Sequence, residues 1–428
     1  MEIKFFTYNK PMIYARVFLN NKEEREILQG FPWVFDNEIS HIKHRKTEKE
    51  EWKNEPLAQC TVEDGSVVEV YSKAGGFLGS GVLNKKSKIT VRIATTLHAD
   101  KFMENPAEYW EEKVHQAYDL RTAQFSPYDS YRLIFAEADF VPGFVCERFC
   151  SEDGKVYLVV QFSAMACEVF RSELVSALVK VCKPDGIYEH DDENARDKEG
   201  LAHNSGWIYG KGDSSIIIKE NGVRLGVDLA NGQKTGYFLD QKLNRVAAAS
   251  FCKGKRVLDT FTHTGAFGLN AFMAGAKDVT SVDISEDAVK MVENNIALNK
   301  AGKVMKAVCA DVFDLLKKYE TEGQKFDVII LDPPAFTKSA KMIEKAYGGY
   351  KEINLRAMRL LNKGGILVTC SCSHFMETQM FCDMIMHAAM DSHCRVQILE
   401  KRGAGPDHPV LLGYPKSEYL KCVICKVM

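Results

Sequence analysis

The stretch LDTFTHTGAFG at residues 258–268 decides the fold class of this chain. The apolar pattern of Lys255–Phe261 predicts a short strand, and Gly265–Ala274 has the pattern of a helix. Gly265 and Gly268 allow a ligand to approach the backbone closely where the helix begins. The first glycines of the dinucleotide-binding turn G-x-G-x-x-G are missing, so a different ligand is expected here.

The pattern of strand followed by helix continues from about residue 215 to the end of the chain. Such alternation predicts a doubly wound α/β sheet that binds its ligands at the carboxyl ends of the strands. The further strands are expected at Asp278–Val282, Ala307–Ala310, Phe326–Leu331, Ile366–Cys370, Val396–Glu400 and Tyr419–Val427, and the further helices at Ser285 to Asn299, Ile353–Leu361 and near Glu377–Met390.

The first half of the chain has two other patterns. Residues 12–95 contain short apolar or alternating runs separated by turns, which is typical of a small β-barrel. Residues 100–205 mix strands and helices, as in a small α/β domain, and residues 215–428 form the doubly wound domain. The charged segments His41–Glu55 and His190–Gly200 are expected to be solvent-exposed.

Composition narrows the class of protein. The 428 residues are 46% hydrophobic and 27% charged, with a net charge of −2. This charge argues against a strongly basic surface for binding nucleic acid. No run of about 18 uncharged apolar residues occurs, and we expect no membrane span. The 13 cysteines are scattered, which favours reduced thiols in the cytoplasm. The sequence leaves the oligomeric state open, a homodimer included.

Three aspartates mark the cofactor site. Asp259, Asp283 and Asp311 each end one of three successive strands. S-adenosylmethionine (SAM) would present an ammonium group, a ribose and an adenine to such an edge, whereas NAD fits less well. The alternative is that these aspartates only cap the helices that follow.

The fourth strand leads into the sequence DPPAF at residues 332–336. Its prolines stiffen the turn and remove two backbone donors. Carbonyl groups and the Asp332 carboxylate are then free to accept hydrogen bonds from the amino group of a base, and Phe336 could pack on its flat face. The alternative is a simple turn from strand to loop.

The fifth strand leads into VTCSCSH at residues 368–374. Carbon 5 of a pyrimidine is weakly nucleophilic, and attack by a thiolate at carbon 6 activates it. Cys372 is favoured as this thiolate because Cys370 still lies within the predicted strand, although both would share one face.

A second cysteine pair lies in the last strand. Cys422 and Cys425 have the spacing of half a zinc site, but within a strand they point to opposite faces. Core thiols are favoured, and we expect no metal.

At these motifs the chain resembles the RlmI-like family of SAM-dependent 23S rRNA (cytosine carbon-5) methyltransferases. The resemblance covers nearly the whole chain, and no single motif would be specific. It implies a Rossmann-like class I methyltransferase domain preceded by a β-barrel PUA domain, which binds RNA, and a small α/β central domain. The matching motifs are LDTF with TGAF at 258–267, DPPAF at 332–336, TCSCS at 369–373, KTGYFLDQ at 234–241, DHPV at 407–410, GFPWVF at 30–35 and EADFVPG at 137–143.

The resemblance also implies residue roles. Asp332 and Pro333 would orient the cytosine, with Asp332 bordering the cofactor as well, and Cys372 or Cys370 would form the covalent adduct at carbon 6. Pro334 stands where many RNA cytosine methyltransferases have a second cysteine, so the base that removes the carbon-5 proton is open among Asp332, His408 and water. The implied cofactor contacts are Asp259, Phe261, Gly265, Asp283 and Asp311, with Gln241 closing the pocket.

Two other functions fit parts of the pattern. Asp-Pro-Pro-aromatic also resembles the motif of enzymes that methylate the amino groups of adenine or guanine, which need no cysteine. The third hypothesis is an assembly factor that binds rRNA without catalysis, and the intact aspartates and Gly265 argue against it.

Overall fold

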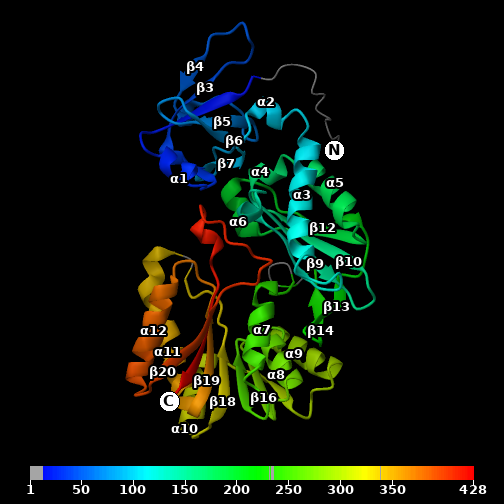
Figure 1. Ribbon diagram of the computed structural model, residues 1–428, viewed down its shortest axis with the longest axis vertical. Coiled ribbons are helices and arrows are strands. Elements are labelled where there is room, and N and C mark those ends of the chain that lie inside the picture. The colour runs from blue at the N-terminus through cyan, green and yellow to red at the C-terminus, as the bar shows by residue number, and fades with distance from the viewer. Residues whose placement is uncertain (1–12, 231, 233–235, 338) are drawn as a thin grey trace.

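The computed structural model describes residues 13–230, 232, 236–337 and 339–428. Met12, the first residue of the predicted barrel, and Lys234 and Thr235 of the KTGYFLDQ motif lie outside the described residues. Figure 1 shows an N-terminal β domain at one end of the long axis, a central α/β domain below it, and a larger C-terminal α/β domain at the other end.

The N-terminal β domain is built on one seven-stranded sheet in the order β2-β7-β6-β5-β1-β3-β4. The predicted β pattern is confirmed, but the predicted exposure of His41–Glu55 is wrong in part. Its ends form a β-hairpin, because Ile42 is fully buried and His44 pairs with Glu55 at 2.8 Å. The elements are β1 (Ala15–Leu19), α1 (Glu24–Leu28), β2 (Trp33–Phe35), β3 (Ile39–His44), β4 (Lys53–Glu55), β5 (Val67–Tyr71), β6 (Phe77–Leu83) and β7 (Ile89–Thr95).

The central domain contains a five-stranded sheet in the order β12-β11-β10-β9-β8. The predicted exposure of His190–Gly200 is wrong in part. Arg196 and Glu199 are buried, because Arg196 pairs with Asp191 at 3.1 Å and Glu199 pairs with Arg92 of the β domain at 3.1 Å. The elements are α2 (Ala99–Phe102), α3 (Pro106–Thr122), β8 (Tyr131–Phe135), β9 (Phe144–Cys150), β10 (Val156–Phe162), α4 (Met165–Glu168), α5 (Arg171–Cys182), β11 (Gly186–His190), α6 (Glu193–Glu199) and β12 (Ser205–Gly210).

The C-terminal domain confirms the predicted alternation. Its seven-stranded sheet has the order β17-β16-β15-β18-β19-β21-β20, parallel from β17 to β19 and antiparallel where β21 joins. A hairpin of β13 (Ser215–Glu220) and β14 (Val223–Asp228) precedes it. The other strands are β15 (Arg256–Thr260), β16 (Asp278–Asp283), β17 (Met305–Cys309), β18 (Phe326–Leu331), β19 (Leu361–Ser371), β20 (Val396–Arg402) and β21 (Lys421–Val427), and the helices are α7 (Lys242–Ala249), α8 (Ala266–Met273), α9 (Glu286–Leu298), α10 (Val312–Thr321), α11 (Ile343–Leu360) and α12 (Thr378–Asp391).

Two apolar cores hold this sheet, one on each face. Val257 of β15 lies in the core under α8 and α9, whereas its neighbour Leu258 lies in the core under α10, α11 and α12. The alternation of side chains along buried parallel strands explains this division. The carboxyl ends of β15, β16, β18 and β19 therefore meet at one edge of a rigid sheet.

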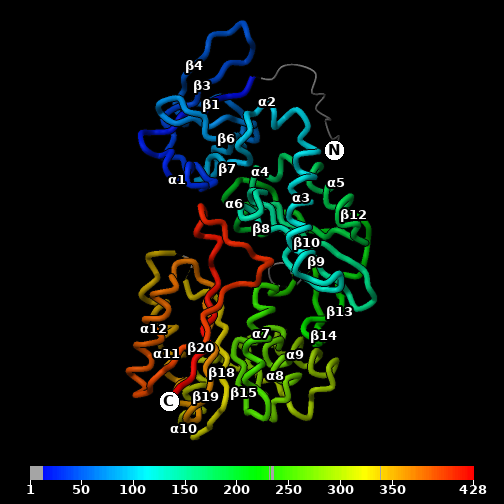
Figure 2. Tube along the Cα trace, in the orientation of Figure 1, coloured from blue at the N-terminus to red at the C-terminus, as the bar shows by residue number. Residues whose placement is uncertain are grey.

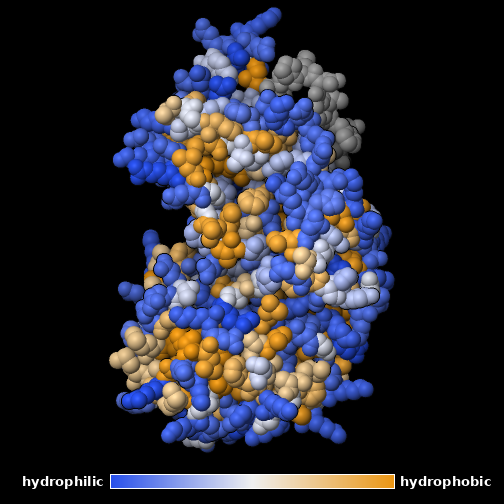
Figure 3. Space-filling model, in the orientation of Figure 1, coloured by the Kyte–Doolittle hydropathy of each residue, from blue (hydrophilic) through white to orange (hydrophobic). Residues whose placement is uncertain are grey.

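The segment between β20 and β21, residues 403–420, connects the two ends of the molecule. It rises from the C-terminal sheet toward the N-terminal β domain (Figures 1 and 2), and the outline of the molecule is notched on one side at this level (Figure 3). Gly413 packs so closely on Gly30 that a side chain there would meet the backbone of the β domain. Arg121 of α3 donates to the carbonyl of Asp407 at 2.8 Å. The three domains thus meet around this segment.

Candidate active site

A cavity of about 330 Å³ opens at the carboxyl ends of β15, β16, β18 and β19. It combines aromatic and other apolar side chains with converging polar and charged groups, which is the usual character of a ligand site. The described residues that line it are Tyr237, Phe238, Asp240, Gln241, Arg245, Phe261, Thr262, His263, Thr264, Ala266, Phe267, Asp283, Ile284, Ser285, Ala288, Asp332, Pro333, Pro334, Cys372 and Leu420.

The glycine turn between β15 and α8 forms one wall of the cavity. Phe261 and His263 have positive φ angles of 56° and 51°, and Gly265 has φ 79°. A Cβ atom on Gly268 would collide with the Ser281 side chain of β16, so α8 can pack this close to the sheet only with glycine at that position. Phe261 lines the cavity, whereas Gly265 is not among the described lining residues and sets the path of the turn.

Asp259 lies beneath this turn. One of its carboxylate oxygens accepts hydrogen bonds from the Thr262 hydroxyl, from the Gly268 amide at 3.0 Å and from the Ser281 hydroxyl at 3.0 Å. Burial raises the pKa of Asp259 to about 6 in spite of these bonds. Asp259 is fully buried and is not among the described residues that line the cavity, so it acts on the site by fixing the turn.

The other two aspartates of the predicted set differ from each other. Asp283 lines the cavity, and its carboxylate accepts from the amides of His263 at 2.9 Å and Ser285 at 3.0 Å. Asp311 is exposed and caps α10 through the amides of Phe313 and Asp314, at 2.8 and 3.3 Å. The capping alternative therefore describes Asp311, whereas Asp283 is placed to meet a ligand.

Asp332 follows β18 and faces the same cavity. Its Oδ1 accepts a hydrogen bond of 2.9 Å from the Gln241 amide, which also lines the cavity. Burial, and then the nearby Asp240 carboxylate, raise the pKa of Asp332 to about 7, whereas Arg245 opposes the shift. Near neutral pH this carboxyl group is therefore divided between its protonated and ionised forms, and the protonated form can donate to a ring nitrogen.

The two cysteines at the end of β19 occupy different environments. Cys372 is partly exposed and lines the cavity with Asp332. Cys370 is fully buried, lies opposite Cys422 of β21, and has a pKa well above the ordinary value because of the Cys422 sulfur and burial. Only the thiol of Cys372 can be reached from the described part of the cavity.

The other residues of the DPPAF motif differ in whether they reach the cavity. Pro333 and Pro334 line the cavity. The Phe336 ring instead packs on Tyr350 at 4.5 Å and Phe313 at 5.9 Å, within the apolar layer below α11. Its predicted contact with a base is therefore not supported by this placement.

Sequence reasoning missed two residues, one that lines the cavity and one that lies next to its Cys372 loop. Arg245 lines the cavity and pairs with Glu220 at 2.7 Å. It lies in α7, whose sequence contains no recognisable motif. Lys421 donates to the carbonyl of Ser373, the residue after Cys372, at 2.6 Å, and a buried lysine at the start of a mainly apolar strand was the signal available for it. His408, a base candidate, is buried beside Asp407 at 3.0 Å and is not among the described lining residues.

The cysteines of β21 behave as predicted from strand geometry. Cys422 lies in the core on one face of the C-terminal sheet, and Cys425 lies in the core on the other. In the described part of the chain, one cluster has metal-ligand chemistry: His44, Glu55 and Cys60 of the N-terminal β domain. Glu55 there already accepts from His44 and from the Thr61 amide at 3.0 Å.

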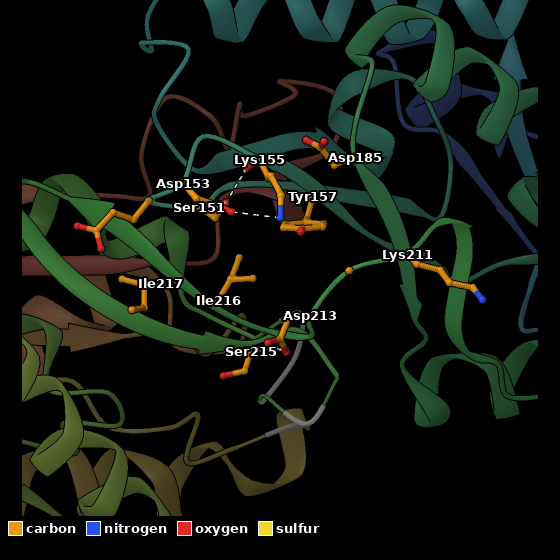
Figure 4. A pocket seen from close by; sticks show the side chains of 12 residues that line it. Ser151, Asp153, Lys155, Tyr157, Asp185, Lys211, Asp213, Ser215, Ile216 and Ile217 are labelled. Atoms are coloured by element: carbon orange, nitrogen blue, oxygen red, sulfur yellow. Dashed lines mark hydrogen bonds and ion pairs between the residues drawn. The ribbon is translucent and has the colours of Figure 1, made fainter.

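A larger hollow of about 660 Å³ lies between the central domain and β13 (Figure 4). Its charged groups are largely satisfied by one another and by the backbone. Asp153 pairs with Lys155 at 3.2 Å, and Asp185 accepts from the Val156 amide at 2.7 Å. The described residues that line it are distinct from those of the first cavity, and we interpret it as a seam between two sheets.

Comparison with known proteins decides the family. The model of S-adenosylmethionine-dependent methyltransferases matches residues 197–413, and that of PUA-like domains matches residues 17–96. Ribosomal RNA large subunit methyltransferase I of Tolumonas auensis is 36% identical over 96% of this chain and 99% of its own length. The protein of the same name from Aliivibrio fischeri is 37% identical over 96% of this chain and 99% of its own.

The chain belongs to this methyltransferase family. It is a SAM-dependent methyltransferase with an N-terminal PUA-like domain, as the sequence motifs predicted. A candidate SAM-dependent methyltransferase from Streptococcus mutans shares the fold, with a TM-score of 0.76 and 23% identity over 97% of this chain and 100% of that one. Another solved structure, a candidate methyltransferase complexed with SAH, matches with a TM-score of 0.77, 23% identity and the same coverage.

The cavity residues fit this cofactor. Thr264 and Ala266 of the glycine turn line the cavity where α8 begins. Asp283 presents a carboxylate suited to ribose hydroxyls, and Phe261 and Ile284 offer apolar surface for a purine ring. No helix among the described residues is both long enough and apolar enough to cross a membrane.

Proposed function

We propose that this enzyme methylates carbon 5 of a cytosine in the large-subunit ribosomal RNA through a covalent adduct with Cys372. The observation that carries the proposal is the joint placement of Cys372 and Asp332 in the cavity that contains the glycine turn. The names of the relatives and the PUA-like domain support an rRNA substrate. Cytoplasmic location, where ribosomal RNA is modified in bacteria, stays a prediction.

The proposed chemistry divides between the two side chains. The Cys372 thiolate adds to carbon 6, while the protonated Asp332 gives its proton to ring nitrogen 3, so that carbon 5 becomes nucleophilic. SAM supplies the electrophilic methyl group that carbon 5 takes up. Loss of the carbon-5 proton to water then breaks the bond to sulfur, and the proton on nitrogen 3 returns to Asp332, which restores both groups.

The amino-group alternative uses the Asp332 carboxyl group only as a hydrogen-bond acceptor. The pKa of Asp332 near 7 makes a protonated, donating form abundant at neutral pH as well, and protonation of a ring nitrogen uses that form. An amino-group methyltransferase would also have no use for a thiol in its base pocket. The placement of Cys372 therefore favours carbon 5.

The position of the methyl group tests this function. We expect large-subunit rRNA from cells that lack the enzyme to lose one 5-methylcytosine, and the purified enzyme with SAM to restore it. Nucleoside mass spectrometry and mapping of the modified position measure both. An amino-methylated base as the product would contradict carbon-5 chemistry, and unchanged rRNA would contradict the substrate.

Asp283 and Asp311, which lie at or just after the ends of successive strands, provide a matched test of the proposed cofactor contacts. We expect Asp283→Ala to weaken SAH binding by about 10- to 100-fold, the effect of losing hydrogen bonds to a charged group. Asp311→Ala should leave SAH affinity unchanged and cost about 1 kcal/mol of stability, because it removes only a helix cap. Calorimetric titration and thermal unfolding measure the two effects, and an equal loss of affinity in both variants would contradict the assignment.

A further inference from the structure

Lys421 is a buried lysine beside the loop that carries Cys372. It begins β21, is 5% exposed, and lies across from Ser371, the residue before Cys372. Its ammonium group donates to the Ser373 carbonyl at 2.6 Å and to the Tyr419 carbonyl at 2.7 Å. The first of these bonds ties Lys421 to the loop that carries Cys372.

The charge of Lys421 is not matched by a carboxylate. Among the described residues none forms an ion pair with it, and the ionisable neighbour with the largest electrostatic effect on it is Cys372, ahead of Glu418. Burial lowers the pKa of the Lys421 ammonium to about 8, and a thiolate at Cys372 would oppose that change. A buried cation of this kind is stabilised by an anion beside it.

We propose that Lys421 is the positioning residue that holds Cys372 in its thiolate form. The thiol proton passes to water, the thiolate takes the place of the missing counter-ion, and the two carbonyl bonds keep the ammonium in position. The catalytic role of this thiolate rests on the proposed function, whereas its stabilisation by Lys421 does not.

The carboxylates, the arginine and the tyrosine near Cys372 do not supply this positive charge. Asp332 and Asp240 carry negative charge when ionised and disfavour a thiolate, and Arg245 is already paired with Glu220. Tyr350 of α11 is hydrogen-bonded to Ser371 at 3.0 Å, and its pKa is raised to about 12 by burial and, to a lesser degree, by Cys372. The remaining groups on the adjoining elements are His374, Glu418, Tyr419, His263 and Asp283.

The pH dependence of Cys372 alkylation tests the proposal without RNA or SAM. Iodoacetamide reacts with the thiolate, and peptide mass spectrometry reports the modified fraction of Cys372 at each pH. We expect Lys421→Gln, whose amide can still donate to a carbonyl, to raise the midpoint of alkylation by about 1 to 3 pH units. Lys421→Arg, which keeps the charge, should retain a midpoint close to that of the unmodified sequence.

Two controls separate charge from damage to the fold. The exposed Cys309 is alkylated in the same samples and should react alike in all variants. If Lys421→Gln unfolds early in a thermal melt, Lys421→Met replaces it. An unchanged midpoint in a folded, uncharged variant would overturn the proposal. Methylation by Cys372→Ala would instead contradict the proposed nucleophile and leave the alkylation result to decide the role of Lys421.

Discussion

Replacing Cys372 by alanine should lower single-turnover methylation by at least about 10³-fold, the scale on which removal of an enzyme nucleophile acts. Without the thiolate, carbon 5 of the base stays too weak a nucleophile to accept the methyl group. Binding of SAH should not change, because the glycine turn and Asp283 are untouched. Tritium transfer from labelled SAM and calorimetry with SAH measure the two quantities.

Cys370→Ala is the matched control for this experiment. Cys370 lies two residues earlier on the same strand, but it is fully buried opposite Cys422. We expect this variant to keep methylation within a few-fold of the unmodified enzyme and to lose some stability from the small cavity it leaves. Loss of activity in Cys370→Ala with full activity in Cys372→Ala would reverse the assignment.

Asp332→Asn should reduce the methylation rate by about 10²- to 10⁴-fold, the usual contribution of a general acid. The asparagine can still accept the hydrogen bond from Gln241, so the turn is preserved, but it has no proton to give to nitrogen 3. With aspartate present, the rate should fall above pH 7, because the folded pKa of about 7 leaves the carboxyl group protonated only below that value. Single-turnover rates between pH 5.5 and about 9 measure this limb.

Asp240→Asn provides a graded version of the same test. The Asp240 carboxylate raises the pKa of Asp332, so its removal should lower that pKa and move the alkaline fall in rate to lower pH. In Asp332→Asn the alkaline fall should vanish from the residual rate. An alkaline limb that persists in Asp332→Asn would show that another group supplies it.

The fold was predictable from the sequence because its signal is local. The apolar strand, the glycine turn and the helix within Lys255–Ala274 follow one another along the chain, and parallel strands with covering helices have few alternatives. The prediction from charge failed in part at His190–Gly200, where Arg196 and Glu199 are buried although most of the segment is exposed. The partners that bury Arg196 and Glu199 include Arg92, which is far away in the sequence.

The residues of the site were predictable only in part, because their roles also depend on where the fold places them. Asp283 and Asp311 have the same sequence context, yet Asp311 follows β17, the edge strand of the sheet, and stays away from the cavity centred on β15. Cys370 and Cys372 differ because β21 covers only the former. Lys421 belongs to no sequence motif. It lies near Cys372 only because β21 pairs with β19 in the folded protein.

The central claim is a covalent bond between Cys372 and the base. RNA that contains 5-fluorocytosine should trap this bond in the presence of SAM, because fluorine at carbon 5 cannot leave as a proton does. We predict a stable protein–RNA adduct whose crosslinked peptide, identified by mass spectrometry, carries the nucleotide on Cys372. An adduct on Cys370, or methylation of the same RNA with no adduct at any cysteine, would contradict the account.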